Sequence, residues 1–203
     1  MTRLRSLALS EFDPELRAML NADDKSEREL RPTSVRAHHP ELAKAYVRFN
    51  AALKQHAVLS LRLRELLRLR IAFHNQCRSC MAMRYSDAVD DGVTEALVCS
   101  LETPHEAPDL TQAERIALRY ADLLSTNHLS IDDALYASLA RHFSEKEVVE
   151  LGSWCAICIG FGRLSATWDM VEDLPDRFQA QGDTPVTPWG SDAWVTQAPA
   201  KAR

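Results

Sequence analysis

The sequence predicts an all-α protein that consists of one helical domain and an irregular C-terminal tail. Apolar residues recur at three- and four-residue steps through most of the chain, and helix-capping residues precede these segments. Strands that alternate between apolar and polar residues and meet at a hairpin turn are not found. A chain of 203 residues is long enough for one well-buried domain. We therefore expect a helical domain over residues 1–174 and a tail over residues 175–203.

The composition is that of a globular protein and favours neither a nucleic-acid partner nor a membrane. Hydrophobic residues make up 46% and charged residues 26%, and the formal net charge of -5 supplies no basic surface for phosphate groups. Residues 1–10 lead to acidic Glu11 and Asp13 before any adequate apolar run, and the apolar stretch 154–161 is too short to span a membrane. Five cysteines, an odd count without an export signal, predict reduced thiols in the cytoplasm.

Capping residues locate the helices in the first quarter of the chain. Asp13 caps a short helix with Pro14 in its first position, where the missing N–H is not needed. A charged connector is expected over residues 21–32. Pro40 then opens a helix over residues 41–55. One apolar stripe on this helix is formed by Leu42, Ala45, Tyr46, Phe49 and Leu53.

Two helices are predicted to meet at Asn75. Ser60 caps the first helix, which ends near residue 74. Asn75 is expected to stop this helix and to cap the next one, over residues 76–89, which closes at the Asp91-Gly92 pair. The first of these helices is expected to bury Leu63, Leu66, Leu67, Ile71 and Ala72.

The chain after Gly92 carries four further helix starts, followed by a tail rich in glycine and proline. Two of the starts are complete capping boxes, in which a threonine or serine is followed three positions later by glutamate. The last start opens a long helix towards Met170. In the tail, Trp189 and Trp194 are the bulky apolar residues, so we expect them to anchor it on the domain or on a neighbouring subunit. The four starts are Thr94, Thr111, Ser130 and Ser144.

The stretch from Glu65 to Arg84 contains the residue types of dithiol redox chemistry. Cys77 and Cys80 lie three residues apart near a helix start, which favours a thiolate and allows a disulfide. Arg84 would stabilise an anion, but a guanidinium stays protonated and cannot serve as a base. Glu65, on the preceding helix, would accept the thiol proton directly or through a water molecule. His74 is a secondary candidate for proton transfer.

A zinc site is an alternative use of these cysteines. Cys155 and Cys158 form a second Cys-x-x-Cys pair that would complete a four-thiolate set. This second pair lies in a strongly apolar helix segment, and we expect it, like Cys99, to pack in the core. His38 and His39 are expected to be solvated or capping residues, because no partner ligand has a suitable spacing. We therefore expect no bound metal and no other cofactor.

A glutamate, eleven intervening residues and a Cys-x-x-Cys pair in an all-helical chain resemble the alkylhydroperoxidase D and carboxymuconolactone decarboxylase superfamily, in its peroxidase-related branch. The specific likeness covers residues 65–88, and a looser one extends over residues 12–172, including a lead-in helix at 38–50 and a closing helix at 154–169. The resemblance implies a helical bundle of the alkylhydroperoxidase D-like type without bound metal. It also implies homo-oligomers, either trimers or hexamers, and a dithiol protein as electron donor.

The resemblance also implies a role for each residue of the site. Glu65 matches a proton-relay glutamate, Cys77 the outer cysteine that takes part in disulfide formation, and Cys80 the inner cysteine that attacks peroxide. Two histidines of the family pattern are replaced by Ser79 and Arg84. Of the family's proton-relay residues, the glutamate is the proton acceptor that this sequence retains, as Glu65.

Three hypotheses about function follow. The first is a thiol-dependent peroxidase or disulfide oxidoreductase of the antioxidant type, which would act on a small hydroperoxide. The alternative is a carboxymuconolactone decarboxylase-like protein that binds or processes a small organic acid near Glu65 and Arg84, without redox use of the cysteines. The third is a structural protein stabilised by zinc. Loss of two thiols per chain after peroxide treatment would favour the first.

Overall fold

The computed structural model describes residues 2–180, 185–190 and 193–196. Within these ranges the chain forms eleven α-helices, three short 3-10 helices (Leu9–Glu11, Ala22–Asp24 and His128–Ser130) and a single pair of two-residue strands. The predicted all-α class is confirmed.

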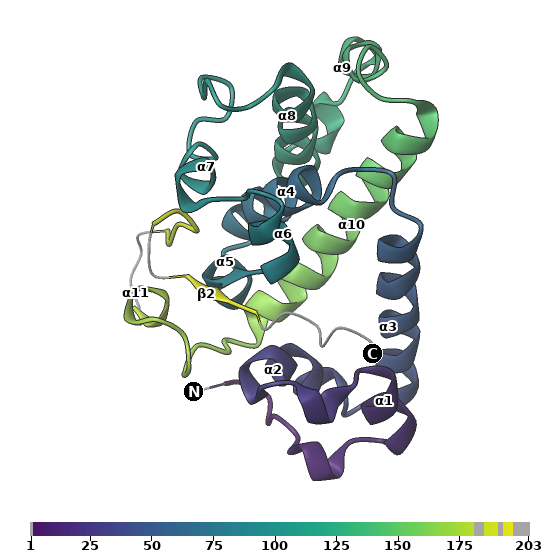
Figure 1. Ribbon diagram of the computed structural model, residues 1–203, viewed down its shortest axis with the longest axis vertical. Helices are drawn as coiled ribbons and strands as arrows, with labels where there is room; N and C mark the ends of the chain where they lie inside the picture. The colour runs from purple at the N-terminus through teal and green to yellow at the C-terminus, as the bar shows by residue number, and fades with distance from the viewer. Residues whose placement is uncertain (1, 181–184, 191–192, 197–203) are drawn as a thin grey trace.

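The first three helices lie together at one end of the molecule (Figure 1). They are α1 (Pro14–Met19), α2 (Glu27–Arg36) and α3 (Pro40–Gln55). Asp13 caps α1 as predicted. The connector expected over residues 21–32 is wrong, because Ser26 and Glu29 form a capping box that starts α2.

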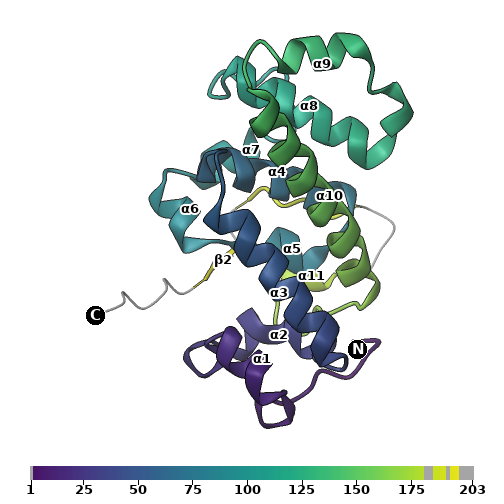
Figure 2. The ribbon, with the colours of Figure 1, turned by 90° about the vertical axis from the view of Figure 1, so that its right-hand side faces the viewer.

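Helix α3 exposes much of its apolar stripe. Leu42 is 61% and Phe49 50% exposed, whereas Tyr46 packs on Phe161 of α10 (Glu145–Thr167) with ring centroids 4.3 Å apart. Figure 2 shows α3 lying beside α10. The stripe predicted from periodicity is therefore covered by this chain only in part.

The main core lies where α4 (Leu61–His74), α8 (Gln112–Thr126) and α10 pack together. The predicted caps of these helices, Ser60, Thr111 and Ser144, each accept a backbone hydrogen bond. The Trp154 indole of α10 donates to the Arg64 carbonyl of α4 at 2.9 Å, which ties the two helices together. All five predicted inward residues of α4 are buried, namely Leu63, Leu66, Leu67, Ile71 and Ala72.

Helix α10 is the predicted long helix: Ser144 caps it and it ends at Thr167, close to Met170. Among the described residues, it is the one helix that is long and apolar enough to cross a membrane, by length and composition alone. In the structure it runs along α4, α8 and α5 (Arg78–Ala82) and buries Leu151, Trp154 and Cys155. These contacts are those of a core helix in a helical bundle.

Two further short helices begin at or close to their predicted capping residues. Thr94 caps α7 (Glu95–Cys99) as predicted, but α9 (Asp133–Leu139) is capped by Asp132 rather than Ser130. Cys99 is exposed, so the prediction that it packs in the core is wrong.

The helix expected over residues 76–89 is wrong, because it is broken into three elements. These are α5, the strand β1 (Met83–Arg84) and α6 (Ser86–Asp90). The Arg84 guanidinium donates to the Met81 and Met83 carbonyls at 2.8 and 3.1 Å. Pairing of β1 with a segment of the tail holds Arg84 in an extended conformation, which stops the helix.

The tail returns to this broken segment. After α11 (Asp176–Gln179), strand β2 (Trp194–Val195) pairs in parallel with β1, with Met83 opposite Trp194. Trp189 packs on Phe73 with ring centroids 5.0 Å apart. The predicted anchoring of both tryptophans on the domain is confirmed.

Candidate active site

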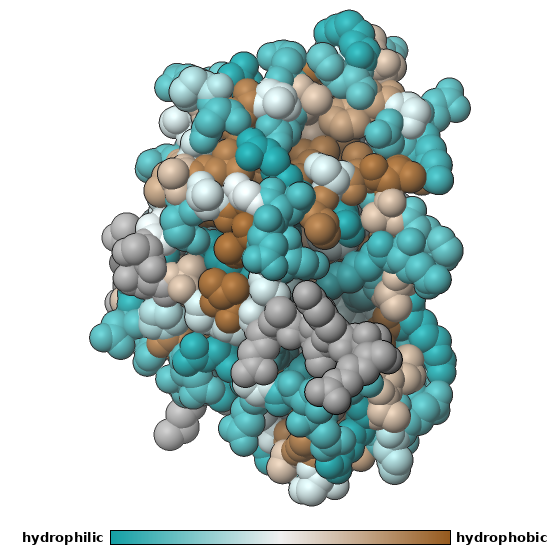
Figure 3. All heavy atoms as spheres, viewed as in Figure 1, coloured by the Kyte–Doolittle hydropathy of each residue, from teal (hydrophilic) through white to brown (hydrophobic). Residues whose placement is uncertain are grey.

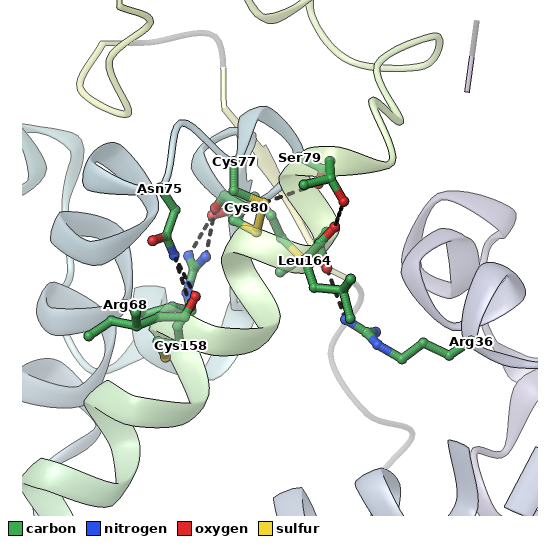
Figure 4. Close-up of a disulfide and its surroundings, with 12 residues drawn as sticks. Arg36, Arg68, Asn75, Cys77, Ser79, Cys80, Cys158 and Leu164 are labelled. Carbon is green, nitrogen blue, oxygen red and sulfur yellow. Dashed lines mark hydrogen bonds between the residues drawn. A yellow bond between two sulfur atoms is a disulfide. The ribbon is translucent and has the colours of Figure 1, made fainter. Parts of the chain in front are cut away.

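Cys77 and Cys80 are joined by a disulfide at the start of α5 (Figure 4). The S–S bond is 2.02 Å and the two Cα atoms are 5.2 Å apart. Cys77 is fully buried and Cys80 is half-buried. The resemblance implied that Cys77 is the outer cysteine, and in this structure Cys80 is the more accessible of the two.

The dithiol turn is positioned by Asn75, which ends α4 rather than capping the next helix. Its side-chain amide donates to the Cys158 carbonyl of α10 at 2.9 Å, and its Oδ1 accepts from Arg163 Nε at 3.1 Å. Gly162 permits this approach, because a Cβ at that position would lie 2.5 Å from Asn75 Nδ2. The predicted role of Asn75 as a helix N-cap is wrong, and Cys77 occupies that position.

Glu65 is buried in an ion pair with Arg68, one turn further along α4. Arg68 Nε and Nη2 donate to the two Glu65 oxygens at 2.6 and 2.7 Å. The same guanidinium donates to the carbonyls of Cys80 and Met83 at 2.7 and 2.8 Å. Burial alone would lower the pKa of Arg68, but the Glu65 carboxylate raises it above its ordinary value. The pair thus links the glutamate to the backbone of the dithiol turn.

This geometry limits what Glu65 can do. Among the residues that the structure describes, no hydrogen bond joins its carboxylate to either sulfur of the disulfide. Both oxygens accept hydrogen bonds from Arg68, so the ion pair would have to open before Glu65 could take up a thiol proton. Sequence reasoning missed Arg68, although its spacing of three residues from Glu65 on a helix is a signal for such a pair.

Cys158 lies beside this ion pair, on α10. Burial raises the pKa of its thiol to about 12, although Arg68 opposes the shift. Burial also raises the pKa of Cys155. Both thiols are therefore protonated at neutral pH. Within the described ranges, no three histidine, cysteine or acidic residues converge as a metal site would require.

Arg84 lies away from the position expected of it. It is 1% exposed, and its guanidinium binds Glu95 at 2.7 and 3.1 Å and the Pro188 carbonyl at 2.6 Å. Burial lowers the pKa of Arg84, and the Glu95 carboxylate opposes this shift. None of its hydrogen bonds within the described residues reaches a sulfur. Its contacts hold β1, α7 and the tail together instead.

His74 faces α8 rather than the disulfide. Its Nε2 lies 2.7 Å from Asp122 Oδ1, and Arg70 Nε donates to the same oxygen at 2.7 Å. Burial alone would raise the pKa of Asp122, but His74 and Arg70 hold it below its ordinary value. These contacts give His74 a structural role in the packing of α4 on α8.

Residues towards the C-terminus also form hydrogen bonds with the dithiol turn. The Gln76 amide donates to the Val186 carbonyl at 3.1 Å and accepts from the Val186 N–H at 2.9 Å. Arg78 donates to the Ala180 carbonyl at 3.1 Å and binds Asp169 at 3.0 Å. Local sequence signals did not reveal these contacts, because they join residues about a hundred positions apart.

A pocket of about 170 Å³ lies next to Glu65, where α3, α4, α6 and α10 converge. Apolar side chains gather in the same part of the surface, over the region where α4, α6 and α10 meet (Figure 3). The pocket was not predicted from the sequence. It is lined by Lys54, Leu61, Arg64, Glu65, Tyr85, Asp87, Ala88 and Trp154.

The central helices are similar in sequence to a known family. Residues 40–123 match the model of the carboxymuconolactone decarboxylase family. The uncharacterized protein Rv2313c of Mycobacterium tuberculosis is 38% identical over 89 residues, which cover 43% of this chain and 31% of that protein. The chain thus spans about a third of the length of this relative.

Comparison with solved structures shows the same fold. A peroxidase-related protein from Ralstonia eutropha, described as an alkylhydroperoxidase AhpD core, superposes with a TM-score of 0.72 at 18% identity and covers 91% of this chain and 97% of its own. The debrominase Bmp8 superposes with a TM-score of 0.68 at 21% identity, over 83% of this chain and 91% of its own.

Proposed function

We propose that the chain is a thiol-dependent peroxidase of the antioxidant type, because residues 40–123 match the carboxymuconolactone decarboxylase family and the fold resembles that of alkylhydroperoxidase D-like proteins. The observation that carries this proposal is the disulfide between Cys77 and Cys80. These two cysteines bond to each other within one helical turn, and one of them is half-buried. Such a pair can cycle between dithiol and disulfide.

The proposed reaction oxidises two thiols for each hydroperoxide. The Cys80 thiolate attacks the terminal oxygen of the hydroperoxide, the O–O bond breaks, and the alcohol leaves after it takes up a proton. Cys80 is then a sulfenic acid. The Cys77 thiol attacks this sulfur, water leaves and the disulfide forms. A dithiol partner protein returns two electrons and two protons and becomes a disulfide itself.

The surroundings of the pair support this order of events. Cys80 is the more accessible cysteine, so a small hydroperoxide reaches it before Cys77. The Arg68 guanidinium is bound to the Cys80 carbonyl at 2.7 Å, and its positive charge favours a thiolate in the same turn. Glu65 is the nearby carboxylate that would receive the thiol proton when its ion pair with Arg68 opens.

Thiol counting after peroxide treatment tests the proposal. The reduced protein is expected to lose two titratable thiols per chain. Cys77→Ser is expected to stop at a sulfenic acid on Cys80, which a dimedone-type reagent captures, and Cys80→Ser is expected to react far more slowly. Cys99→Ser is the control, since Cys99 is exposed and outside the site. Equal thiol losses in all three variants would rule out the assigned pair.

We also propose a cellular location and an oligomeric state for the protein. We place it in the cytoplasm, where a dithiol donor protein is reduced, and as a homo-oligomer, either a trimer or a hexamer. Leu42 and Phe49 support an assembly, because α3 leaves these large apolar side chains at least half exposed. Light scattering coupled to gel filtration gives the molar mass that decides between monomer, trimer and hexamer.

A further inference from the structure

The Ser79 hydroxyl contacts one sulfur of the disulfide (Figure 4). Its Oγ lies 3.6 Å from Cys77 Sγ, and among the described residues no other hydrogen bond reaches either sulfur of the pair. A disulfide sulfur carries no hydrogen, so the hydroxyl is the donor. Ser79 therefore directs its hydrogen at Cys77 and not at Cys80.

This hydroxyl is available for the sulfur because Ser79 lies in the first turn of α5. A serine inside a helix commonly donates to the carbonyl four residues earlier, as Ser153 does to Val149 at 2.8 Å. The residue four positions before Ser79 is Asn75, which belongs to the end of α4. Where the structure describes the chain, the hydroxyl of Ser79 donates to no carbonyl and caps no helix, so its hydrogen bond is the one to Cys77.

The two sulfurs differ in how easily a partner reaches them. Cys80 is half-buried, whereas Cys77 is fully buried. An incoming thiolate attacks the sulfur that it can reach, so it bonds to Cys80 Sγ and Cys77 Sγ is the leaving group. The leaving sulfur thus becomes a thiolate inside the protein, where burial disfavours its negative charge. Cys77 is the sulfur that needs a hydrogen-bond donor.

We propose that the Ser79 hydroxyl stabilises Cys77 as the leaving thiolate when a dithiol partner reduces the disulfide. A partner thiolate attacks Cys80 Sγ, the bond between Cys80 and Cys77 breaks, and its electron pair goes to Cys77 Sγ, which accepts the Ser79 hydrogen bond. The second partner thiolate attacks the partner sulfur bound to Cys80, the partner becomes a disulfide, and Cys80 leaves as a thiolate. The two cysteines take up the two protons that the partner thiols released.

The inference rests on the proposed dithiol–disulfide cycle and adds a catalytic residue to its reductive half. A hydrogen bond to a thiolate is charge-assisted and is stronger than one to a neutral disulfide sulfur. The contact therefore strengthens as charge develops on Cys77, which is what lowers the barrier of a step. The buried Arg68 does not replace it, because its hydrogen bonds go to Glu65 and to the carbonyls of Cys80 and Met83.

Reduction of the disulfide form by dithiothreitol under native conditions tests the proposal. Diamide, a two-electron oxidant, forms the disulfide beforehand, so the result does not depend on reactivity with hydroperoxide. Ser79→Ala is expected to be reduced at least about threefold more slowly than the wild type, because the leaving thiolate loses its donor and a thiol of higher pKa leaves more slowly. Ser79→Thr keeps a hydroxyl and is expected to stay within about twofold of the wild-type rate.

Ser153→Ala is the matched control, because Ser153 is also half-buried and its hydroxyl donates to a carbonyl instead of a sulfur. Its reduction rate is expected to equal that of the wild type. A second readout is the pKa of Cys77 in the reduced protein, from the ultraviolet absorbance of the thiolate after subtraction of the matching Cys77→Ser protein. This pKa is expected to rise by about one unit in Ser79→Ala.

These readouts separate catalysis from a merely structural role. Alanine is the better helix former, so Ser79→Ala is expected to stay folded, which circular dichroism checks, and any loosening of the turn would speed reduction. Ser79→Ala reduced as fast as the wild type or faster, Ser79→Thr as slow as Ser79→Ala, or an unchanged Cys77 pKa would overturn the inference. A wild-type protein that shows the expected differences but does not react with hydroperoxide would contradict the peroxidase proposal alone.

Discussion

At the scale of single residues, the site depends on a buried ion pair that connects α4 to the dithiol turn. Arg68 binds Glu65 through two nitrogens and the Cys80 carbonyl through a third. A spacing of three residues on a helix predicts the ion pair from the sequence. The hydrogen bond from Arg68 to the Cys80 carbonyl depends on how α4 and α5 pack. The local sequence therefore identifies the residues of the site better than it identifies their partners.

Removal of one member of this pair is expected to leave a buried charge. Arg68→Met leaves the Glu65 carboxylate buried without its ion-pair partner. We expect this variant to lower the free energy of unfolding by about 3–5 kcal/mol. The Glu65→Leu/Arg68→Met double variant removes both charges and is expected to recover much of this loss. Urea unfolding followed by circular dichroism measures both. A double variant less stable than Arg68→Met would contradict the account.

Two glycines of α10 offer a matched pair for the positioning of the dithiol turn. A Cβ on Gly162 would lie 2.5 Å from the Asn75 amide, whereas a Cβ on Gly160 would meet nothing within 4 Å. Gly162→Ala is expected to destabilise the protein by about 1–3 kcal/mol, because Asn75 must move. Gly160→Ala is expected to stabilise it by about 0.5–1 kcal/mol, through helix propensity. Thermal unfolding of the two variants gives the comparison, and equal shifts would argue against the close approach.

Arg84 shows the limit of spacing arguments at this scale. It lies four positions after Cys80, which would place it near the sulfur on a continuous helix. Its guanidinium instead binds Glu95 and the carbonyl of Pro188, a residue 104 positions away. No local pattern reveals a partner at that distance in the chain.

At the scale of elements, capping chemistry predicted most of the helices. The starts of α1, α4, α7, α8 and α10 agree with the sequence, because a side chain that accepts a hydrogen bond from the first turn leaves a local signature. The capping box formed by Ser26 and Glu29 has the same signature, but Pro32 lies inside α2, and a proline within a segment argues against predicting a helix there. The break between α5 and α6 could not be predicted, because its cause is the pairing of β1 with the tail.

The tail is expected to control access to the dithiol turn. Gln76 makes two hydrogen bonds to Val186, and Trp189 packs on Phe73, the residue that precedes the end of α4. A chain that ends at Ala180 loses both contacts and the β1–β2 pairing. We expect it to be less stable by at least about 2 kcal/mol, since much of the loss is aromatic packing.

Reduction kinetics separate this role from a purely structural one. In the shortened chain, we expect dithiothreitol to reduce the disulfide several-fold faster under native conditions, because the turn is uncovered. Gln76→Ala is expected to give an intermediate rate with the tail still present. Unchanged reduction rates in a shortened chain that remains folded would show that the tail does not cover the site.

At the scale of the whole molecule, the fold follows from the burial of α4 by α8 and α10. The all-α class and the inward face of α4 were predictable, because they depend on periodicity alone. The arrangement around the dithiol was not, since it combines the end of α4, the C-terminal half of α10 and the tail (Figure 4). The family match covers residues 40–123, so α10 and the tail contribute to the site from outside the matched region.

The central claim is that Cys77 and Cys80 form the redox centre of the molecule. Peptide mapping by mass spectrometry, after the fully reduced and folded protein meets one equivalent of hydroperoxide, tests it most directly. We expect one new disulfide, between Cys77 and Cys80, with Cys99, Cys155 and Cys158 still reduced. Oxidation that begins on any of these other three cysteines, or a Cys77 and Cys80 pair that remains reduced, would contradict it.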